Sequence, residues 1–300
     1  MMSFKIKSRE DFNIEMPVEG IFNSSTDIFG LVSGAKKAVY LTLDNDKVEK
    51  FLEVLNYFGP DKEFKIVEAP DRDWIYRLDG NREKRHLFIG EDYDHLLKLK
   101  NAFDYDFSGV SHQEIGVLLS YPKCCASRKD YMIDIKSYFP ENPYKINFLM
   151  NNFHIKSDSN IFLFSHHPCS HQCKETLEYS KKVYEWLDRF PEIKKKIGTL
   201  LKLPVAYLFP EMKNHRALSV GIAYVFKGHY EEEGLMSYDD LYYFTKFADD
   251  ITDTEEAEDL LEKFKLGNKL KVGKSKIEIF EEDELKETIE NERLILVNPQ

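Results

Sequence analysis

The chain has 300 residues and a formal net charge of −11, from 53 acidic and 42 basic side chains. This acidic balance excludes a chain-wide basic face of the kind that binds nucleic acid or anionic lipid. Apolar residues make up 42% of the sequence and charged residues 32%, which is typical of a globular protein. At roughly 100–200 residues per domain, the length favours more than one domain.

The sequence has no run that approaches the roughly 18 apolar residues of a transmembrane helix. The first residues, Met1 to Lys7, lack the apolar stretch and small-residue cleavage site of a secretory signal. We therefore expect a cytoplasmic protein. Thiols stay reduced in the cytoplasm, so clustered cysteines favour a metal site or catalysis over structural disulfides.

The first 105 residues alternate strand-like and helix-like patterns. Apolar side chains recur at helical spacing from Val48 to Phe58, and Gly59-Pro60 ends that run. A turn at Asp79-Gly80-Asn81 separates shorter segments rich in strand-forming residues. The predicted strands are 37–43, 64–67, 74–78 and 86–89, and the predicted helices are 48–58 and 90–102.

In the middle of the chain, two predicted helix starts carry cysteines. A helix over 112–119 ends before Tyr121-Pro122, and proline favours the first turn of a helix, so Cys124 and Cys125 fall at the start of a new one. A buried strand is predicted over 160–164. A long helix is then predicted from Ser170 to Lys202, with an interruption at Pro191.

The remainder alternates strands and helices again. A hairpin is predicted about Gly273-Lys274, and the acidic run 255–259 is interpreted as a solvated helix face. The predicted strands are 204–209, 218–225, 269–272, 275–280 and 294–297, and the predicted helices are 254–264 and 282–290.

These elements predict an α+β (or α/β) protein. An N-terminal α/β part, residues 1–105, is expected to pack on a Cys/His-containing α+β core, residues 106–230. Residues 231–300 are expected to form a C-terminal extension of a β-hairpin and helices.

All four cysteines of the chain lie within 50 residues of one another, in two clusters. Cys124 and Cys125 are adjacent, and Cys169 and Cys173 lie four apart beside His166, His167 and His171. If a helix begins near Ser170, the spacing directs Cys169 and Cys173 toward one face. A thiolate at a helix N-terminus is stabilised by the helix dipole. Two such starts that face each other predict a metal site.

The sequence leaves three kinds of site open. Zinc takes four Cys or His ligands, and because adjacent cysteines are expected to diverge, the favoured set is one of Cys124 and Cys125 with Cys169, Cys173 and a histidine. His167 is the preferred histidine because Pro168 fixes the turn beside Cys169. An iron–sulfur cluster accepts divergent thiolates more easily, since its cysteines bind separate irons. Without metal, Cys124 and Cys125 form a vicinal dithiol, or Cys169 acts as a nucleophile served by His167.

Weaker catalytic candidates are Glu211, His215 and Arg216. They follow a predicted strand, where site residues of α/β sheets often lie, and they offer an acid, a base and an anion clamp. No glycine-rich phosphate loop, G-x-S-x-G or H-E-x-x-H motif occurs in the sequence.

The cysteine motifs resemble those of a known family. Leu118-Leu119-Ser120-Tyr121-Pro122-Lys123-Cys124-Cys125 and His167-Pro168-Cys169-Ser170-x-x-Cys173 are similar to an uncharacterised, mainly archaeal family called domain of unknown function four-eight-three. The likeness runs from about Leu87 to Tyr230. The family carries glycine where this chain has Ser120. The resemblance implies no established activity, but it implies that the four cysteines and His167 are motif positions.

The sequence therefore predicts a Cys/His metal centre, zinc or iron–sulfur, held by Cys124, Cys125, His167, Cys169 and Cys173. The protein is interpreted as an enzyme or enzyme component that uses this centre on a small-molecule substrate. Two alternatives stay open: a non-catalytic protein whose structural metal leaves an acidic surface for a protein partner, and a metal-free thiol redox protein. Nucleic acid and membrane are not expected partners.

Overall fold

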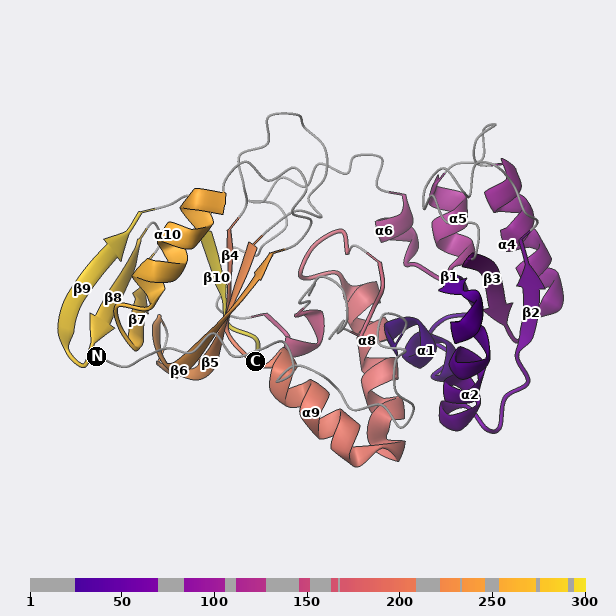
Figure 1. Ribbon diagram of the computed structural model, residues 1–300, viewed down its shortest axis with the longest axis horizontal. Coiled ribbons are helices and arrows are strands. Elements are labelled where there is room, and N and C mark those ends of the chain that lie inside the picture. The colour runs from indigo at the N-terminus through magenta and orange to yellow at the C-terminus, as the bar shows by residue number, and fades with distance from the viewer. Residues whose placement is uncertain are drawn as a thin grey trace.

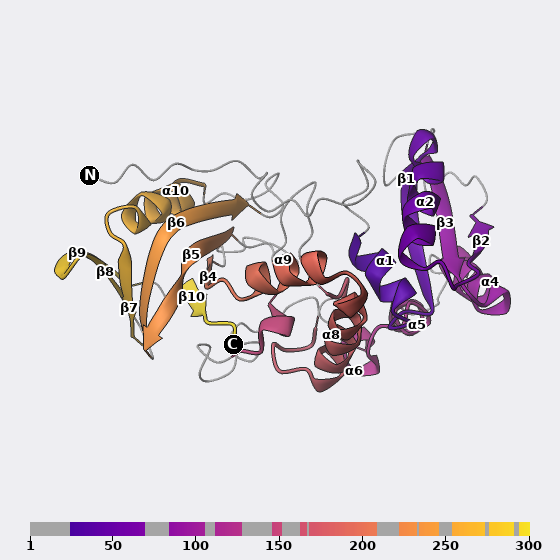
Figure 2. The same ribbon diagram turned by 90° about the horizontal axis from the view of Figure 1, so that it is seen from below.

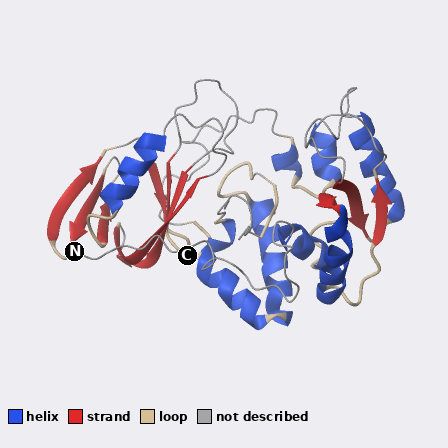
Figure 3. Ribbon diagram, viewed as in Figure 1, coloured by secondary structure: helices blue, strands red, loops and turns tan. Residues whose placement is uncertain are grey.

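The computed structural model describes residues 25–69, 84–105, 112–127, 146–151, 163–166, 168–208, 222–232, 234–245, 254–273, 276–290 and 294–300. The molecule is elongated (Figure 1). A small sheet with its helices lies at one end, helices lie in the middle, and a larger sheet lies at the other end. The same order is seen from below (Figure 2), and strands are confined to the two ends (Figure 3).

The small sheet has three antiparallel strands in the order β1-β3-β2. Along β3, Leu87 and Ile89 pack into the core with α1 and α2, whereas Phe88 faces the core with α4 and α5. This alternation buries both faces of the sheet, as expected of a strand whose side chains point to opposite sides. The elements are α1 (Ser25–Val32), β1 (Ala38–Asp44), η2 (Asn45–Lys47), α2 (Val48–Phe58), β2 (Lys65–Glu68), β3 (Lys84–Gly90), α4 (Tyr93–Tyr105) and α5 (His112–Leu118).

Helices form the middle of the molecule. Pro191 interrupts the predicted long helix as expected, because it occupies the first position of α9. The predicted start at Ser170 is wrong, since α8 begins at Lys174. The reason is a turn at Ser170, whose carbonyl accepts the Cys173 N–H (3.1 Å) and whose hydroxyl accepts the Gln172 N–H (3.3 Å). The elements are α6 (Lys123–Ala126), η3 (Phe148–Met150), α8 (Lys174–Trp186), η4 (Leu187–Arg189) and α9 (Pro191–Leu201).

The larger sheet has seven strands in the order β10-β4-β5-β6-β7-β8-β9, and each of its described ladders is antiparallel. Helix α10 covers one face, where Phe264 packs against Tyr224 and Phe226. From the other face, Val205 and Val225 reach the core of the middle helices. The elements are β4 (Val205–Leu208), β5 (Ile222–Glu232), β6 (Leu235–Thr245), α10 (Thr254–Phe264), β7 (Lys269–Val272), β8 (Ile277–Glu281), β9 (Glu284–Ile289) and β10 (Leu294–Val297).

The helix predicted over 282–290 is wrong, because Glu284–Ile289 form strand β9. The chain reverses after β8 through Glu282, which has a φ of 56°. It then pairs with β8 from Glu284 to Ile289. Backbone pairing at a sheet edge therefore overrides the helix propensity of a segment rich in Glu, Leu and Lys.

The predicted α+β class is confirmed by helices combined with antiparallel sheets. The hairpin expected near Gly273 is confirmed as β7–β8. Of the strand expected over 160–164, the described residues Leu163 and Phe164 are buried but irregular. The strand expected over 74–78 lies outside the described residues. The domain division at residues 105 and 230 stays a prediction, and the larger sheet takes strands from both sides of residue 230.

Candidate metal centre

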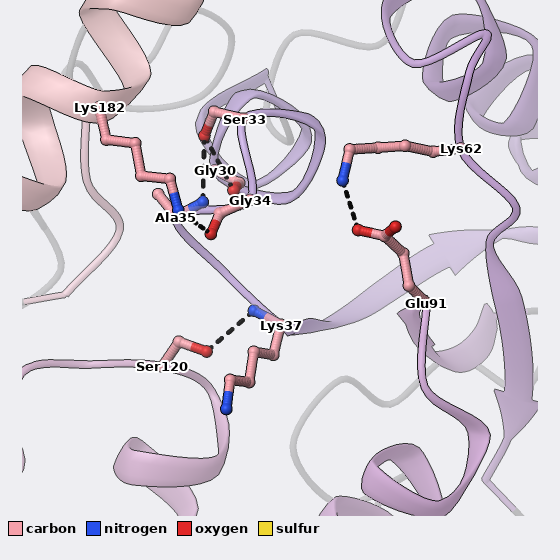
Figure 4. Close-up of polar contacts among 9 residues, drawn as sticks. All are labelled: Gly30, Ser33, Gly34, Ala35, Lys37, Lys62, Glu91, Ser120 and Lys182. Carbon is pink, nitrogen blue, oxygen red and sulfur yellow. Dashed lines mark hydrogen bonds and ion pairs between the residues drawn. The ribbon is translucent and has the colours of Figure 1, made fainter.

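A tight turn leads from α5 into the first cysteine pair. Ser120 has a φ of 65°, and the Tyr121 N–H donates to the Gly116 carbonyl across it (2.8 Å), which is the Schellman ending of a helix. The backbone conformation at Ser120 favours glycine, in agreement with the glycine that the family resemblance implies at this position. The Ser120 hydroxyl accepts the Lys37 N–H (2.9 Å), so this turn is tied to the residue before β1 (Figure 4).

Helix α6 begins directly after this turn, as the proline predicted. Pro122 is extended, with φ −52° and ψ 135°, and caps the N-terminus of α6. Cys124 and Cys125 therefore occupy its first turn. Their Sγ atoms lie 3.7 Å apart, so the expectation that adjacent cysteines diverge is wrong. Successive helical side chains are about 100° apart around the axis, and both thiols still reach a common point.

The second cysteine pair lies on the turn before α8. Cys173 is the N-cap of that helix and Cys169 lies in the preceding loop, so the two do not share a helix face as predicted. The Cys169 N–H donates to Cys125 Sγ at 3.3 Å and joins the two segments. Helix α8 is also fixed to the N-terminal part of the molecule, where the Lys182 ammonium donates to the Gly34 carbonyl (2.6 Å; Figure 4).

The four sulfurs form one compact group. Cys173 Sγ lies 3.6 Å from both Cys124 Sγ and Cys125 Sγ, and with Cys169 Sγ all four lie within 4.8 Å of one another. Four sulfurs bound at about 2.3 Å to one tetrahedral ion lie about 3.8 Å apart. The three short separations thus match one face of a tetrathiolate tetrahedron. The cluster is positioned to hold a single metal ion.

Burial and hydrogen bonding set the protonation of these thiols. Burial is the largest cause that raises the pKa of Cys124, and hydrogen bonds to Glu175 and Cys173 add to it. Burial likewise raises the pKa of Cys125 to about 12 and raises that of Cys169. Burial opposes ionisation of Cys173 too, but interactions with Thr176, Cys124 and Cys125 together lower its pKa. Burial thus favours the protonated form of Cys124, Cys125 and Cys169 when no metal is bound.

Two residues beside the cluster were missed by the sequence analysis. The exposed Glu175 accepts hydrogen bonds from Cys124 Sγ (3.2 Å) and Cys173 Sγ (3.6 Å), and the Cys124 contact is the main cause that lowers the Glu175 pKa. Thr176 is fully buried, and its Oγ1 lies 3.5 Å from Cys125 Sγ. The missing signal was the helix start: with Cys173 as N-cap, these residues occupy the second and third positions, whose side chains return toward the cap.

The histidines take different positions. His167 lies outside the described residues, so its predicted role as a ligand stays a prediction. His166 is buried, and its Nε2 contacts Thr176 Oγ1 at 2.8 Å. Burial lowers the pKa of His171 to about 3, so its imidazole is neutral at physiological pH. Among the described residues, the group placed to hold an ion consists of the four cysteines alone.

The catalytic candidates Glu211, His215 and Arg216 also lie outside the described residues, and a catalytic role for them stays a prediction. Within the ranges that the structure describes, no helix is both long enough and apolar enough to cross a membrane.

Comparison with known proteins identifies a family for the region of this site. A family model described as Protein of unknown function (DUF483) matches residues 88–202. That segment runs from β3 to the end of α9 and contains all four cysteines. The resemblance seen in the sequence is thereby confirmed, since residues 88–202 match the model of this uncharacterised family. No curated protein and no solved structure matches the chain.

Proposed function

We propose that the protein binds one zinc ion through Cys124, Cys125, Cys169 and Cys173. The observation that carries this proposal is the set of sulfur separations of 3.6–3.7 Å, which suits a single tetrahedral ion. His167 is not needed in this ligand set, because four thiolates complete it.

The chemistry of the donor set favours zinc over an iron–sulfur cluster. In a cluster the cysteines bind different irons, and bridging sulfides fill the space between those irons. The thiolates of a cluster must therefore lie farther apart than thiolates on one ion. The close packing of the four sulfurs, all within 4.8 Å, leaves room for one ion.

A closed shell of four thiolates is the arrangement of structural zinc, whereas catalytic zinc keeps a position for water. We infer that the ion ties α6 to the turn before α8, segments whose cysteines lie 44–49 residues apart in sequence. The function supported best is a non-catalytic, zinc-stabilised protein, and its net charge of −11 suits binding to a protein partner of opposite charge. All four cysteines are free thiols, which suits a reducing compartment such as the cytoplasm.

Metal-free thiol chemistry is less well supported. A reactive cysteine is a thiolate, and its pKa is usually depressed. Here burial raises the pKa of Cys124, Cys125 and Cys169, so the vicinal dithiol and the Cys169 thiol are poor nucleophiles when no metal is bound. The thiol with a lowered pKa, Cys173, is buried.

The test is metal analysis of protein purified without oxygen. We expect one zinc per chain, no colour, and a visible spectrum of four-thiolate tetrahedral cobalt after exchange with Co²⁺. Cys173→Ser is expected to lose the metal, whereas the matched variant Ser170→Ala, in the same turn, is expected to retain it. If the protein is brown and contains iron and sulfide, the zinc proposal is wrong and the site holds an iron–sulfur cluster. If the purified protein contains no metal, and neither zinc nor a chelator changes its stability against unfolding, the metal proposal is refuted.

A further inference from the structure

One side of the sulfur group faces solvent and the other faces the protein core. Cys124 and Cys169 are partly exposed, whereas Cys125 and Cys173 are buried. Cys125 Sγ has two polar neighbours, the Cys169 N–H at 3.3 Å and the Thr176 hydroxyl at 3.5 Å. A tetrathiolate zinc centre carries a net charge of −2, so the thiolate on the buried side depends most on hydrogen-bond donors.

The Thr176 hydroxyl is held in place from two directions. Its side chain is 0% exposed in the first turn of α8, and a β-branched residue in a helix has few rotamers. His166 Nε2 lies 2.8 Å from Thr176 Oγ1. The His166, Thr176 and Cys125 side chains thus form a buried row of polar contacts that ends at a sulfur.

The imidazole of His166 is fixed by three aromatic rings. The ring centroids of Tyr121 and Phe164 each lie 5.3 Å from it, and that of Tyr179 lies 5.7 Å from it in an edge-to-face arrangement. His166 is 4% exposed. Its Nε2 therefore points at Thr176 because packing leaves the ring little freedom to turn.

Once a metal is bound, the number of available protons determines which group donates and which accepts in each of these contacts. A metal-bound Cys125 has no proton, so in its contact with Thr176 Oγ1 the hydroxyl is the donor. The same hydroxyl also interacts with Cys173, a second thiolate when the metal is bound. A hydroxyl has one proton, so Thr176 Oγ1 must then accept from His166, whose Nε2 carries the hydrogen.

Given the zinc site proposed above, we propose that Thr176 and His166 are positioning residues for the metal centre. His166 orients the Thr176 hydroxyl, and that hydroxyl donates a hydrogen bond to the thiolate of Cys125. Hydrogen bonds from outside the ligand shell hold ligand orientation and affect metal affinity, and their loss commonly weakens binding by about 10–100-fold.

The test compares variants of the full chain by zinc affinity and by the sulfur-to-metal absorption of the Co²⁺ form. Thr176→Val keeps the shape of the side chain and removes the donor. We expect about tenfold weaker zinc binding and a shift of the sulfur-to-cobalt band to lower energy, since an unbonded thiolate donates charge more readily. Thr176→Ser restores the donor and should return both values toward wild type.

His166→Phe keeps an aromatic ring among Tyr121, Phe164 and Tyr179 but removes the nitrogen. It should shift the band in the same direction as Thr176→Val, and the double variant should add little to Thr176→Val alone. The control is Ser180→Ala, one helical turn along α8, where a buried hydroxyl donates to the Thr176 carbonyl and does not reach the sulfurs. It should leave the cobalt band unchanged.

The outcomes separate this inference from the zinc proposal. If wild-type protein binds neither zinc nor cobalt through thiolates, the zinc proposal itself fails. If wild type shows the tetrathiolate spectrum and Thr176→Val gives the same band and affinity, the positioning role is refuted. It is also refuted if Ser180→Ala moves the band as far, because the effect is then one of general packing. Circular dichroism of each metal-loaded variant identifies any that does not fold.

Discussion

The turn at Ser120 allows a quantitative test of how the first cysteine pair is presented. Ser120 has a φ of 65°, a left-handed conformation that costs an L-residue other than glycine about 1 kcal/mol or more. The Ser120 hydroxyl accepts a hydrogen bond from the Lys37 N–H at 2.9 Å. The net contribution of this bond, about 1 kcal/mol, offsets the backbone strain. Two substitutions separate these two contributions.

Ser120→Ala removes the hydrogen bond and keeps the backbone strain, so we expect it to destabilise the protein by about 1 kcal/mol. Ser120→Gly also removes the bond but relieves the strain, so its free energy of unfolding is expected to remain close to wild type. The free energy of unfolding of the glycine variant should therefore exceed that of the alanine variant by about 1 kcal/mol. Neither substitution touches a sulfur, so zinc content should stay at one per chain.

The assay is denaturant unfolding of the zinc-loaded variants, followed by far-UV circular dichroism at fixed free zinc. Fixed free zinc matters because bound metal adds to apparent stability by mass action. The reasoning is refuted if alanine is as stable as glycine, since the left-handed turn then imposes no cost. It is refuted equally if the alanine variant is as stable as wild type, because the hydrogen bond to the Lys37 N–H then contributes nothing.

Three further predictions follow from burial and close contacts. Because three cysteines have a raised pKa, zinc binding must displace at least three protons. The apparent zinc affinity should therefore fall steeply as the pH decreases from 8 to 6, and competition titrations with a slope of one proton or less would contradict this. The Tyr179 hydroxyl is buried without a hydrogen-bond partner in the part of the chain that the structure describes. Tyr179→Phe should therefore leave the free energy of unfolding unchanged or raise it by about 1 kcal/mol. A clear loss of stability in thermal unfolding would contradict this. A Cβ at Gly90 would lie 2.4 Å from the Lys37 carbonyl oxygen. Gly90→Ala should therefore destabilise the protein by roughly 2 kcal/mol. A variant that calorimetry finds as stable as wild type would refute the close packing of β3 on the chain before β1.

Local patterns predicted the fold well where one face of an element is buried. The segment Val48–Phe58 is helical as expected, because its apolar spacing matches its buried face and Gly59 follows. The start of α4 was placed at Gly90 instead of Tyr93, since the Asp92 carboxylate accepts the N–H groups of Asp94 and His95 and so caps the helix later. Strand β9 could not be read from its residues, because its conformation follows from pairing with β8.

The candidate site was predictable as a grouping but not as a geometry. Proline before Lys123 correctly indicated a helix start at the first cysteine pair. The sequence did not reveal that both Cys124 and Cys125 reach the same point, because that depends on how α6 lies against the turn at Cys169. The role of Thr176 depends on the start of α8, which lies four residues later than the sequence predicts. Tertiary placement, which no local pattern encodes, supplies these details.

The division of the ligands between two distant segments has a kinetic consequence. Each segment brings two thiols that are near neighbours in sequence, so either pair can capture an ion before the chain has folded. Completion of the shell requires closure of a loop of 44 residues between Cys125 and Cys169, which is slower than capture by either pair alone. Metal uptake during folding should therefore show two phases, and the slower phase should report when α6 reaches the turn before α8.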